Sequence, residues 1–315
     1  MKRGTKKTSE KKSGVLKELK KNRTLYLMML PGILFILVFN YFPMTGIIMA
    51  FKDGMSTRGY FSGAWVGLKN FEFFFRSNDA ARITFNTLFM NGLFIIVRLV
   101  ASVAVALLLN EIRSKKAVKT YQSVLLLPHF LSWVVIGFVT YAFLNIDYGL
   151  INRMLNIFGA TSVEWYSEPK YWPGILTVVE LIKTTGYYSI VYYAGIVGIN
   201  QDIYEAAAVD GASRFNIIMK ITLPMLKPLI ITMVLMQIGK IFFADFGLFY
   251  YVPRETGALF SRTDVIDTYV YRSLRVLGNS GMSAAVGLFQ SVAGFIVVLL
   301  SNWLVRRYDS DNALF

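Results

Sequence analysis

Six long apolar stretches constrain the fold of this chain more than any other feature. They cover about residues 25–51, 84–109, 121–144, 172–199, 226–250 and 283–305. Each has the roughly 20 residues that an α-helix needs to cross about 30 Å of hydrocarbon. In lipid, backbone polar groups must bond within their own segment, and a helix achieves this. The sequence therefore predicts an all-α integral membrane protein, with six transmembrane helices in one domain over residues 24–307.

The composition agrees with this prediction and excludes several classes of function. The 315 residues are 55% hydrophobic and 17% charged, which is too apolar for a soluble protein of this size. Cysteine is absent, so the chain has neither a disulfide framework nor a thiolate metal site. The single histidine, His129, argues against a histidine metal site and a histidine-dependent enzyme. We expect a non-catalytic protein without a metal or a cofactor of its own.

A nucleotide-binding loop is also missing from the sequence. Gly239-Lys240 ends like a phosphate-binding loop, but Val234 stands where the first glycine should be. These residues also fall inside an apolar stretch. If this chain takes part in uphill transport, the energy must therefore come from another chain.

The positive charge of the chain is unevenly distributed. The formal net charge is +14, and ten of the 33 Lys and Arg residues precede Thr24. Residues 1–23 thus predict a basic cytoplasmic tail with a short interfacial helix, in contact with anionic lipid rather than nucleic acid. With the amino terminus inside, the inner segments hold 19 Lys and Arg residues and the outer segments 11. This asymmetry favours a cytoplasmic amino terminus. Residues 308–315 form a cytoplasmic tail to which no role is assigned.

The segment Tyr204–Pro228, between the fourth and fifth apolar stretches, predicts a short helix that ends in a turn. Asn200 and Asp202 can accept hydrogen bonds from the free N–H groups at the start of this helix. Glu205 follows in the first turn, where the helix dipole favours an anion. Gly211 supplies a position at which a left-handed turn costs little. The sequence predicts that the chain reverses at Gly211.

A second short helix is expected after this turn. Ser213–Ile221 contains several apolar residues, and Leu223-Pro224 is expected to end the helix, with Pro228 opening the next span. The small side chains of residues 206–208 allow another surface to approach the backbone closely. The charges of the whole segment nearly cancel, which favours a protein partner over lipid. The positive charges belong to Arg214, Lys220 and Lys227, and the negative charges belong to Asp202, Glu205 and Asp210.

At these residues the chain resembles a known family. Glu205-Ala206-Ala207, Asp210-Gly211 and Leu223-Pro224 resemble the EAA loop of ABC-importer permeases. Over nearly its full length, the chain resembles the sugar and oligosaccharide permeases of the carbohydrate-uptake branch. The resemblance implies the type I importer permease fold, in the bacterial inner membrane. It also implies that residues 200–228 form the coupling helix loop, which docks into a cytoplasmic ATPase.

The resemblance further implies roles and partners. Glu205 is expected to face a basic group on the ATPase, Gly211 to form the elbow, and Ala207 to make the close contact. The expected partners are a second, usually homologous permease, two ATPase subunits that hold ATP and Mg, and an extracytoplasmic binding protein.

Polar residues inside the apolar stretches predict a substrate path. In the fourth stretch, Glu180, Lys183, Thr184 and Tyr187 lie on one helical face. Hydrogen-bonding groups and aromatic faces are what a sugar ring requires, and both are present. The full set of candidates is Glu180, Lys183, Thr184, Tyr187, Tyr188, Gln237, Lys240, Phe242 and Asp245.

A structural interpretation of these charges stays open. Glu180 and Lys183 could instead pair with each other, or with Lys240 and Asp245, to hold the bundle together. Arg98 in the second stretch is expected to snorkel or to pair between helices. His129, beside Pro128 at an expected helix break, is expected to be structural.

Two other classes of function also stay open. A permease for a non-sugar solute, such as a peptide or phosphate, would keep the coupling loop but differ in its cavity. A secondary transporter would need no ATPase. We therefore expect the permease subunit of a sugar importer, with these two classes as alternatives.

Overall fold

The computed structural model describes residues 21–53, 62–276 and 278–308, and it is helical in most of these ranges. The only extended pairing among the described residues is an isolated bridge between Lys52 and Trp65. The basic tail predicted before residue 21 and the end of the chain after residue 308 lie outside the described residues. The chain divides into two compact units, Met1–Ile48 and Met49–Phe315.

The first unit contains most of the predicted first span. Helix α2 (Arg23–Ile36) continues into a π-helical turn, η1 (Leu37–Tyr41), and then into a 3-10 helix, η2 (Phe42–Phe51), which runs into the second unit. The wider π turn comes directly before Pro43, whose ring and missing N–H are incompatible with a regular α-helical turn. None of the residues of α2 is buried. An apolar helix that is exposed on all sides requires lipid or another protein to cover it.

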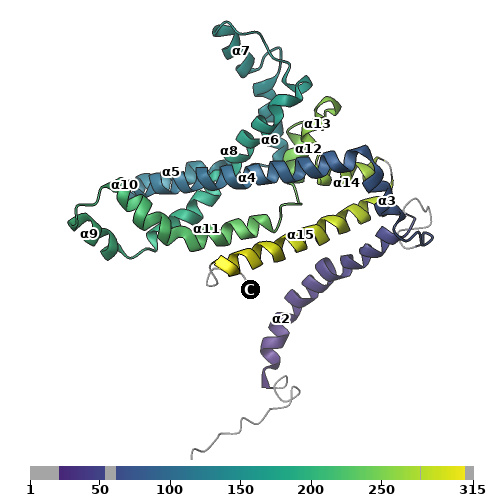
Figure 1. The fold of residues 1–315 in the computed structure, drawn as a ribbon, viewed down its shortest axis with the longest axis horizontal. Helices are drawn as coiled ribbons and strands as arrows, with labels where there is room; N and C mark the ends of the chain where they lie inside the picture. The colour runs from purple at the N-terminus through teal and green to yellow at the C-terminus, as the bar shows by residue number, and fades with distance from the viewer. Residues whose placement is uncertain (1–20, 54–61, 277, 309–315) are drawn as a thin grey trace, which may run out of the picture. The chain divides into compact units, whose positions relative to one another are not determined.

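Four long helices dominate the second unit (Figure 1). They are α4 (Asn78–Asn110), α8 (Trp172–Val197), α11 (Leu223–Ile238) and α15 (Ser280–Tyr308). Helices α4 and α8 pack along each other more extensively than any other pair of elements. The predicted spans 84–109, 172–199 and 283–305 therefore correspond to single helices.

Helix α8 joins two parts of the hydrophobic core. Near its start, Trp172 and Leu176 are fully buried against residues that include Leu248 of α12 (Phe246–Tyr251). Near its end, Tyr192 and Ile196 pack with α4 and α11. Since both clusters depend on α8, this helix positions the elements around it.

Four helical stretches of the described chain are long and apolar enough to cross a membrane. They are Arg23–Phe51, Asp79–Asn110, Arg214–Ile238 and Ser280–Arg307. A fifth is formed if the bent pair Lys115–Phe130 and Trp133–Leu144, which meet at 96°, counts as one span. Helix α8 is long enough but more polar, and it is not among them.

The bent pair lies where the sequence predicts a break. Helix α5 (Lys115–Leu126) ends in a 3-10 turn, η3 (Leu127–Phe130), which contains Pro128. The next helix, α6 (Trp133–Leu144), starts at Ser132, whose side chain accepts a hydrogen bond from the N–H of Val135 at 3.3 Å. Proline interrupts the helix because it lacks an N–H, and the serine cap starts a new one in another direction.

The predicted helix end at Leu223-Pro224 is wrong. Helix α10 (Arg214–Ile217), a π-helical turn η6 (Ile218–Thr222) and α11 form one continuous helical path. The wider π turn lies directly before Pro224 and accommodates its ring and its missing N–H. Pro228 lies inside α11 rather than opening it.

The fifth apolar stretch also ends earlier than predicted. Helix α11 stops at Ile238, and a turn over residues 239–245 precedes α12. Asp245 begins α12, because its side chain accepts hydrogen bonds from the N–H groups of Gly247 and Leu248. Residues 226–250 are therefore not one helix. The turn between α11 and α12 lines the cavity described below.

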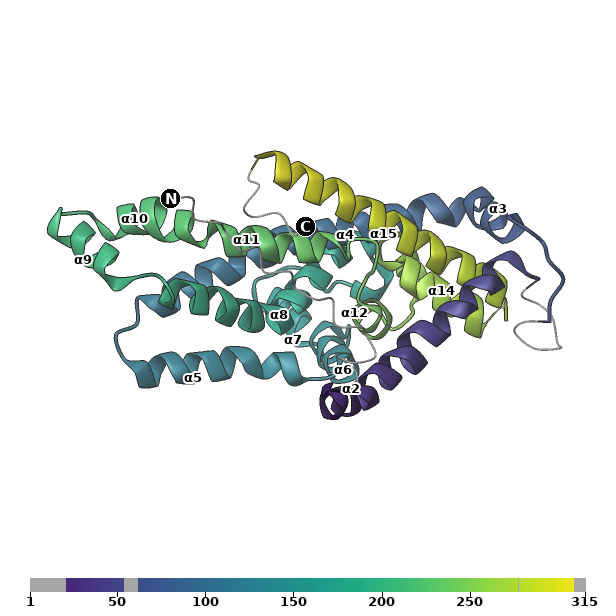
Figure 2. The same cartoon turned by 90° about the horizontal axis from the view of Figure 1, so that it is seen from below.

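Some of the shorter elements lie near the two ends of the second unit. Helices α9 (Gln201–Val209) and α10 lie at one end, together with the α4–α5 connection (Figures 1 and 2). Helices α3 (Lys69–Arg76) and α14 (Ile266–Arg275) lie at the opposite end. The remaining short elements are α7 (Leu150–Ile157), α13 (Phe260–Thr263), η4 (Trp165–Ser167), η5 (Pro169–Tyr171) and η7 (Gly257–Leu259). The connection between α4 and α5 and the segment predicted to couple to an ATPase are thus at the same end.

Candidate functional site

A cavity of about 780 Å³ lies between α4, α8, α11 and the turn before α12. The structure brings seven of the nine predicted path residues to its wall. They are Glu180, Thr184, Tyr187, Tyr188, Gln237, Lys240 and Asp245. Other lining residues include Asn91, Phe94 and Phe243.

Lys183 is not among the lining residues. Its ammonium donates hydrogen bonds to the backbone carbonyls of His129, at 3.0 Å, and of Leu131, and it lies 4.9 Å from the centre of the Trp133 ring. Because the helix is broken between η3 and α6, carbonyls at the break lack helical partners. Lys183 satisfies two of them and ties α8 to the break.

Phe242 also lies away from the cavity. Its side chain is buried in a cluster with residues of α15, and its ring meets that of Phe289 at 6.0 Å between centroids. Its carbonyl accepts a hydrogen bond from the side chain of Gln290 at 2.7 Å. The neighbouring residue, Phe243, faces the cavity instead.

One ion pair crosses between the two central helices. Arg98 of α4 and Glu180 of α8 lie 2.8 Å apart, and their side chains are only 15% and 7% exposed. Arg98 also donates a hydrogen bond to the hydroxyl of Tyr188 at 3.2 Å. The interhelical pairing predicted for Arg98 is confirmed. The suggestion that Glu180 pairs with Lys183 is wrong, because Lys183 is drawn to the carbonyls at the helix break.

Several buried polar atoms on the cavity wall have no partner within the described protein. They are Arg98 Nε, His129 Nδ1, Glu180 Oε2 and Gln237 Oε1. A buried polar group without a hydrogen bond costs free energy, so these atoms favour an ordered water within the wall.

Aromatic rings lie beside these polar atoms. The rings of His129 and Tyr187 stack at 4.8 Å between centroids, and Tyr187 meets Tyr188 edge-to-face at 5.4 Å. The cavity thus combines hydrogen-bonding groups with aromatic faces, which together suit a sugar ring. Arg98 could have been linked to this wall from the sequence, since it is the only charge inside its apolar stretch.

The segment predicted to couple to an ATPase, residues 200–228, contains the elbow that the sequence predicts. The side chain of Asn200 caps α9 by accepting a hydrogen bond from the N–H of Asp202 at 3.0 Å. Gly211 has a φ of +75°. The N–H of Ala212 reaches the carbonyl of Ala207 at 2.9 Å, and the N–H of Gly211 reaches that of Ala208 at 3.1 Å. This pair of bonds is the Schellman motif that ends a helix at a glycine.

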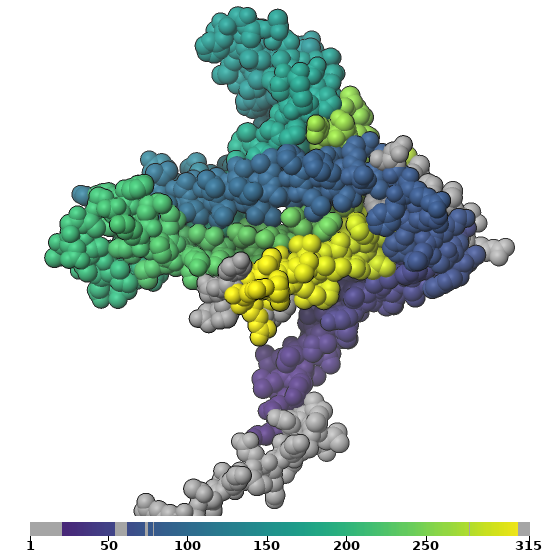
Figure 3. Space-filling view, viewed as in Figure 1, coloured from purple at the N-terminus to yellow at the C-terminus, as the bar shows by residue number. Residues whose placement is uncertain are grey.

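This coupling segment exposes apolar side chains at its tip. Val209 is 88% exposed and Phe215 is 70% exposed. Glu205, Ala206, Asp210 and Pro224 are exposed as well, while Ala207 and Leu223 are half-buried. In the space-filling view, the segment forms one end of the second unit (Figure 3). Exposed apolar residues at a protruding tip are typical of a surface that another protein covers.

Two contacts attach the coupling segment to the long helices. Arg214 forms an ion pair with Glu111, directly after α4. The hydroxyls of Tyr204 and Thr222 lie 3.2 Å apart and join α9 to the π turn before α11. A displacement of the segment would therefore act on both α4 and α11, which form two walls of the cavity.

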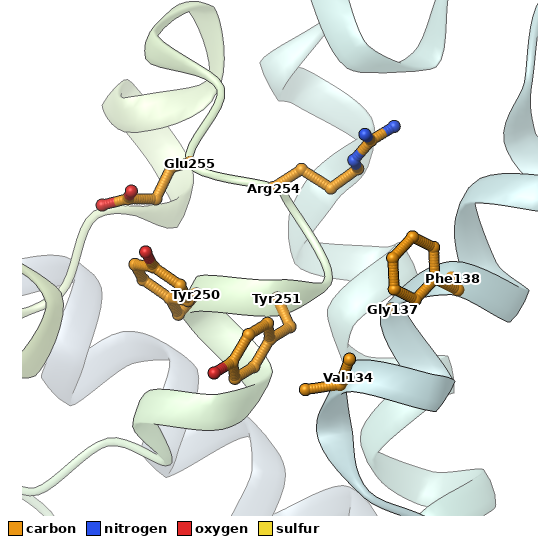
Figure 4. A pocket seen from close by; sticks show the side chains of 7 residues that line it. All are labelled: Val134, Gly137, Phe138, Tyr250, Tyr251, Arg254 and Glu255. Carbon is orange, nitrogen blue, oxygen red and sulfur yellow. The ribbon is translucent and has the colours of Figure 1, made fainter.

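A smaller cavity of about 190 Å³ lies between α6 and α12 (Figure 4). The side chains of Arg254 and Glu255 point to opposite sides of it. Both residues have a positive φ, of 59° and 49°, and the Arg254 guanidinium lies 4.0 Å from the centre of the Tyr141 ring. None of the residues predicted for substrate or ATPase contact lines this cavity.

Comparison with known proteins identifies the family. The model for "binding-protein-dependent transport system inner membrane component" matches residues 84–310. The chain belongs to this family. The resemblance to importer permeases is therefore confirmed, and the protein is a multi-pass permease of the bacterial inner membrane.

Individual proteins similar to this chain include permeases and importers of polysaccharides. The chain is 32% identical to the polygalacturonan/rhamnogalacturonan transport system permease protein YteP of Bacillus subtilis, over 96% of this chain and 94% of YteP. It is also similar to a chain of a bacterial ABC transporter involved in the import of the acidic polysaccharide alginate. The TM-score is 0.86, at 32% identity, with 94% of this chain and 99% of that chain covered. A second structure of the alginate transporter, in complex with a periplasmic protein bound to an alginate pentasaccharide, gives a TM-score of 0.85 at 33% identity. It covers 93% of this chain and 98% of that chain.

Proposed function

We propose that this chain is the permease subunit of an ATP-driven importer and forms the path of a sugar or oligosaccharide into the cell. The observation that carries the proposal is the cavity of about 780 Å³ with aromatic rings and hydrogen-bonding side chains among its lining residues. The relatives named above support it, since one is a permease for polysaccharide transport and the other belongs to an importer of one.

The proposed topology has six transmembrane helices and a cytoplasmic amino terminus. Helix α8 is not among the helices whose length and composition qualify them as spans. Its charged residue Glu180, however, pairs with Arg98 inside the bundle. An ion pair between helices keeps both charges away from lipid. The bent pair α5–α6 supplies another span. The excess of Lys and Arg in the inner segments supports this orientation, in which residues 200–228 would be cytoplasmic.

The coupling segment is proposed to dock onto an ATPase subunit, which holds the ATP and Mg that this non-catalytic chain does not bind. Glu205 would face a basic group, Ala206 and Ala207 would permit close approach, and Gly211 would set the angle of the elbow. Asp210 ends α9 directly before that elbow, and Leu223 with Pro224 joins the segment to α11.

The complete importer is proposed to contain a second permease, two ATPase subunits and an extracytoplasmic binding protein. The structure of the alginate transporter with its periplasmic protein supports the last of these. Closure of the ATPases would move the coupling segment, and the Arg214–Glu111 ion pair and the continuous helix from Arg214 to Ile238 would transmit that motion to α4 and α11. The wall of the cavity would then shift between a state that is open to the inside of the cell and one that is open to the outside.

Reconstitution with the subunits encoded beside it would test this function. We expect ATP-dependent uptake of a saccharide into proteoliposomes. Tyr187→Ala should lower that uptake about tenfold without changing the protein level, because Tyr187 lies on the cavity wall. Tyr121→Ala is a matched control, since Tyr121 lies on α5 and is 54% exposed. Uptake that persists without an ATPase would contradict the proposed function, and normal uptake by Tyr187→Ala would remove Tyr187 from the path.

A further inference from the structure

We propose that Lys240 presents to the cavity an ammonium group without an ion-pair partner, and that this group selects saccharides that bear carboxylates. The inference rests on the proposed function and narrows its substrate class. It follows from an inventory of the charged groups around the cavity.

The other charged groups around the cavity already have partners, although Asp245 keeps its negative charge. Arg98 and Glu180 neutralise each other at 2.8 Å. The ammonium of Lys183 is held by two backbone carbonyls and does not line the cavity. Both oxygens of Asp245 accept hydrogen bonds. One accepts from the indole N–H of Trp133 at 2.9 Å, and the other from the N–H of Gly247 at 2.9 Å.

Lys240 differs from these groups. It lines the cavity from the turn after α11, and its side chain is exposed. Within the described residues, it makes none of the ion pairs. An ammonium group inside a membrane bundle needs an anionic or hydrogen-bonding partner, and a carboxylate supplies both. A carboxylate on the transported molecule would neutralise Lys240 in the path.

The groups around Lys240 suit the remainder of a sugar ring. Gln237 precedes Lys240 by almost one helical turn. Its Nε2 donates a hydrogen bond to the carbonyl of Met233 at 3.2 Å, and its Oε1 is buried without a partner. Glu180 is 5% exposed, and its Oε2 also lacks a partner. Both residues line the cavity, and their side chains carry hydrogen-bond acceptors of the kind that sugar hydroxyls bind. Tyr187 offers an aromatic face on the same wall.

The test compares two probes that differ only at their carboxyl groups, which are charged in one and esterified in the other. Trigalacturonate and its fully methyl-esterified form are titrated into the importer complex in lipid nanodiscs, without the binding protein, so that the selectivity measured belongs to the membrane part. We expect the acid to bind about tenfold more tightly than the ester, and this preference to shrink as salt is raised. Lys240→Met should abolish the preference, and Lys240→Arg should keep it. Lys119→Met is the matched control, because Lys119 is an exposed lysine of α5 that lies outside the cavity.

Three results would overturn the inference. These are equal affinity of the wild-type complex for acid and ester, failure of both probes to bind, and an unchanged preference in Lys240→Met. The wild-type comparison needs no variant, so the inference stays testable if Lys240→Met does not fold. ATP-dependent uptake of a neutral oligosaccharide without any charge preference would leave the proposed function intact and overturn only the role of Lys240.

Discussion

The coupling segment and the cavity wall are proposed to work together, yet they are built in different ways. In the coupling segment, Asn200 and Gly211 determine the structure through bonds to residues close to them in the chain, and the apolar tip is exposed. The wall of the cavity joins α4, α8 and α11, and its ion pair links Arg98 to Glu180. Substitutions in the wall should therefore lower stability, whereas substitutions in the coupling segment should impair coupling and leave the fold intact.

The largest effect on stability is expected from Glu180→Gln. This substitution leaves the charge of Arg98 buried without its counter-ion. Removal of one partner of a buried ion pair lowers the free energy of unfolding by roughly 3–5 kcal/mol. The melting temperature of the detergent-solubilised complex should fall markedly. The double variant Arg98→Gln/Glu180→Gln should recover part of the loss, since neither charge remains. A single variant as stable as the wild type would show that the pair does not hold the wall together.

A smaller loss is expected from Gly186→Ala in the same helix. A Cβ at Gly186 would collide with the backbone of Leu125 in α5, and overpacking of this kind costs about 1–3 kcal/mol. Gly174→Ala is the matched control, because a Cβ at Gly174 meets no atom within 4 Å. We expect the melting temperature to fall for Gly186→Ala only. If both variants melt alike, close packing of α8 on the broken span is not what positions the wall.

The smallest effect on stability is expected in the coupling segment. A Cβ at Gly211 meets no atom within 4 Å, so Gly211→Val should act only through its positive φ, at a cost of about 1–2 kcal/mol. The complex should keep nearly its full melting temperature and its ATP hydrolysis, but lose uptake per ATP hydrolysed. Gly211→Asn should retain more coupling, since asparagine adopts this conformation more readily. Intact coupling in Gly211→Val would argue against an elbow role.

Features that depend on neighbouring residues were predictable from the sequence. The cap at Asn200, the left-handed turn at Gly211 and the break at Pro128 each follow from the chemistry of one residue and its immediate neighbours. The continuation of the helix through Pro224 was not predictable, because the π turn before it reroutes the backbone hydrogen bonds. No residue pattern in the sequence marks that turn.

The composition of the cavity wall was predictable only in part. The helical period placed Glu180, Thr184 and Tyr187 on one face of α8, and all three line the cavity. The same period also placed Lys183 there, although its ammonium bonds to the carbonyls of the broken span. The period of a helix describes one element, while the direction of a long side chain depends on what a second element offers it.

The sequence by itself determined that this chain is a helical membrane protein, because long apolar stretches in lipid leave the backbone few alternatives, and it determined the turn at Gly211. The tertiary structure decided which charges neutralise each other. Arg98 lies far from Glu180 in the chain and meets it only because α4 packs along α8, which leaves Lys240 as the cation that faces the cavity. Such pairings depend on distances in space, which the order of residues does not contain.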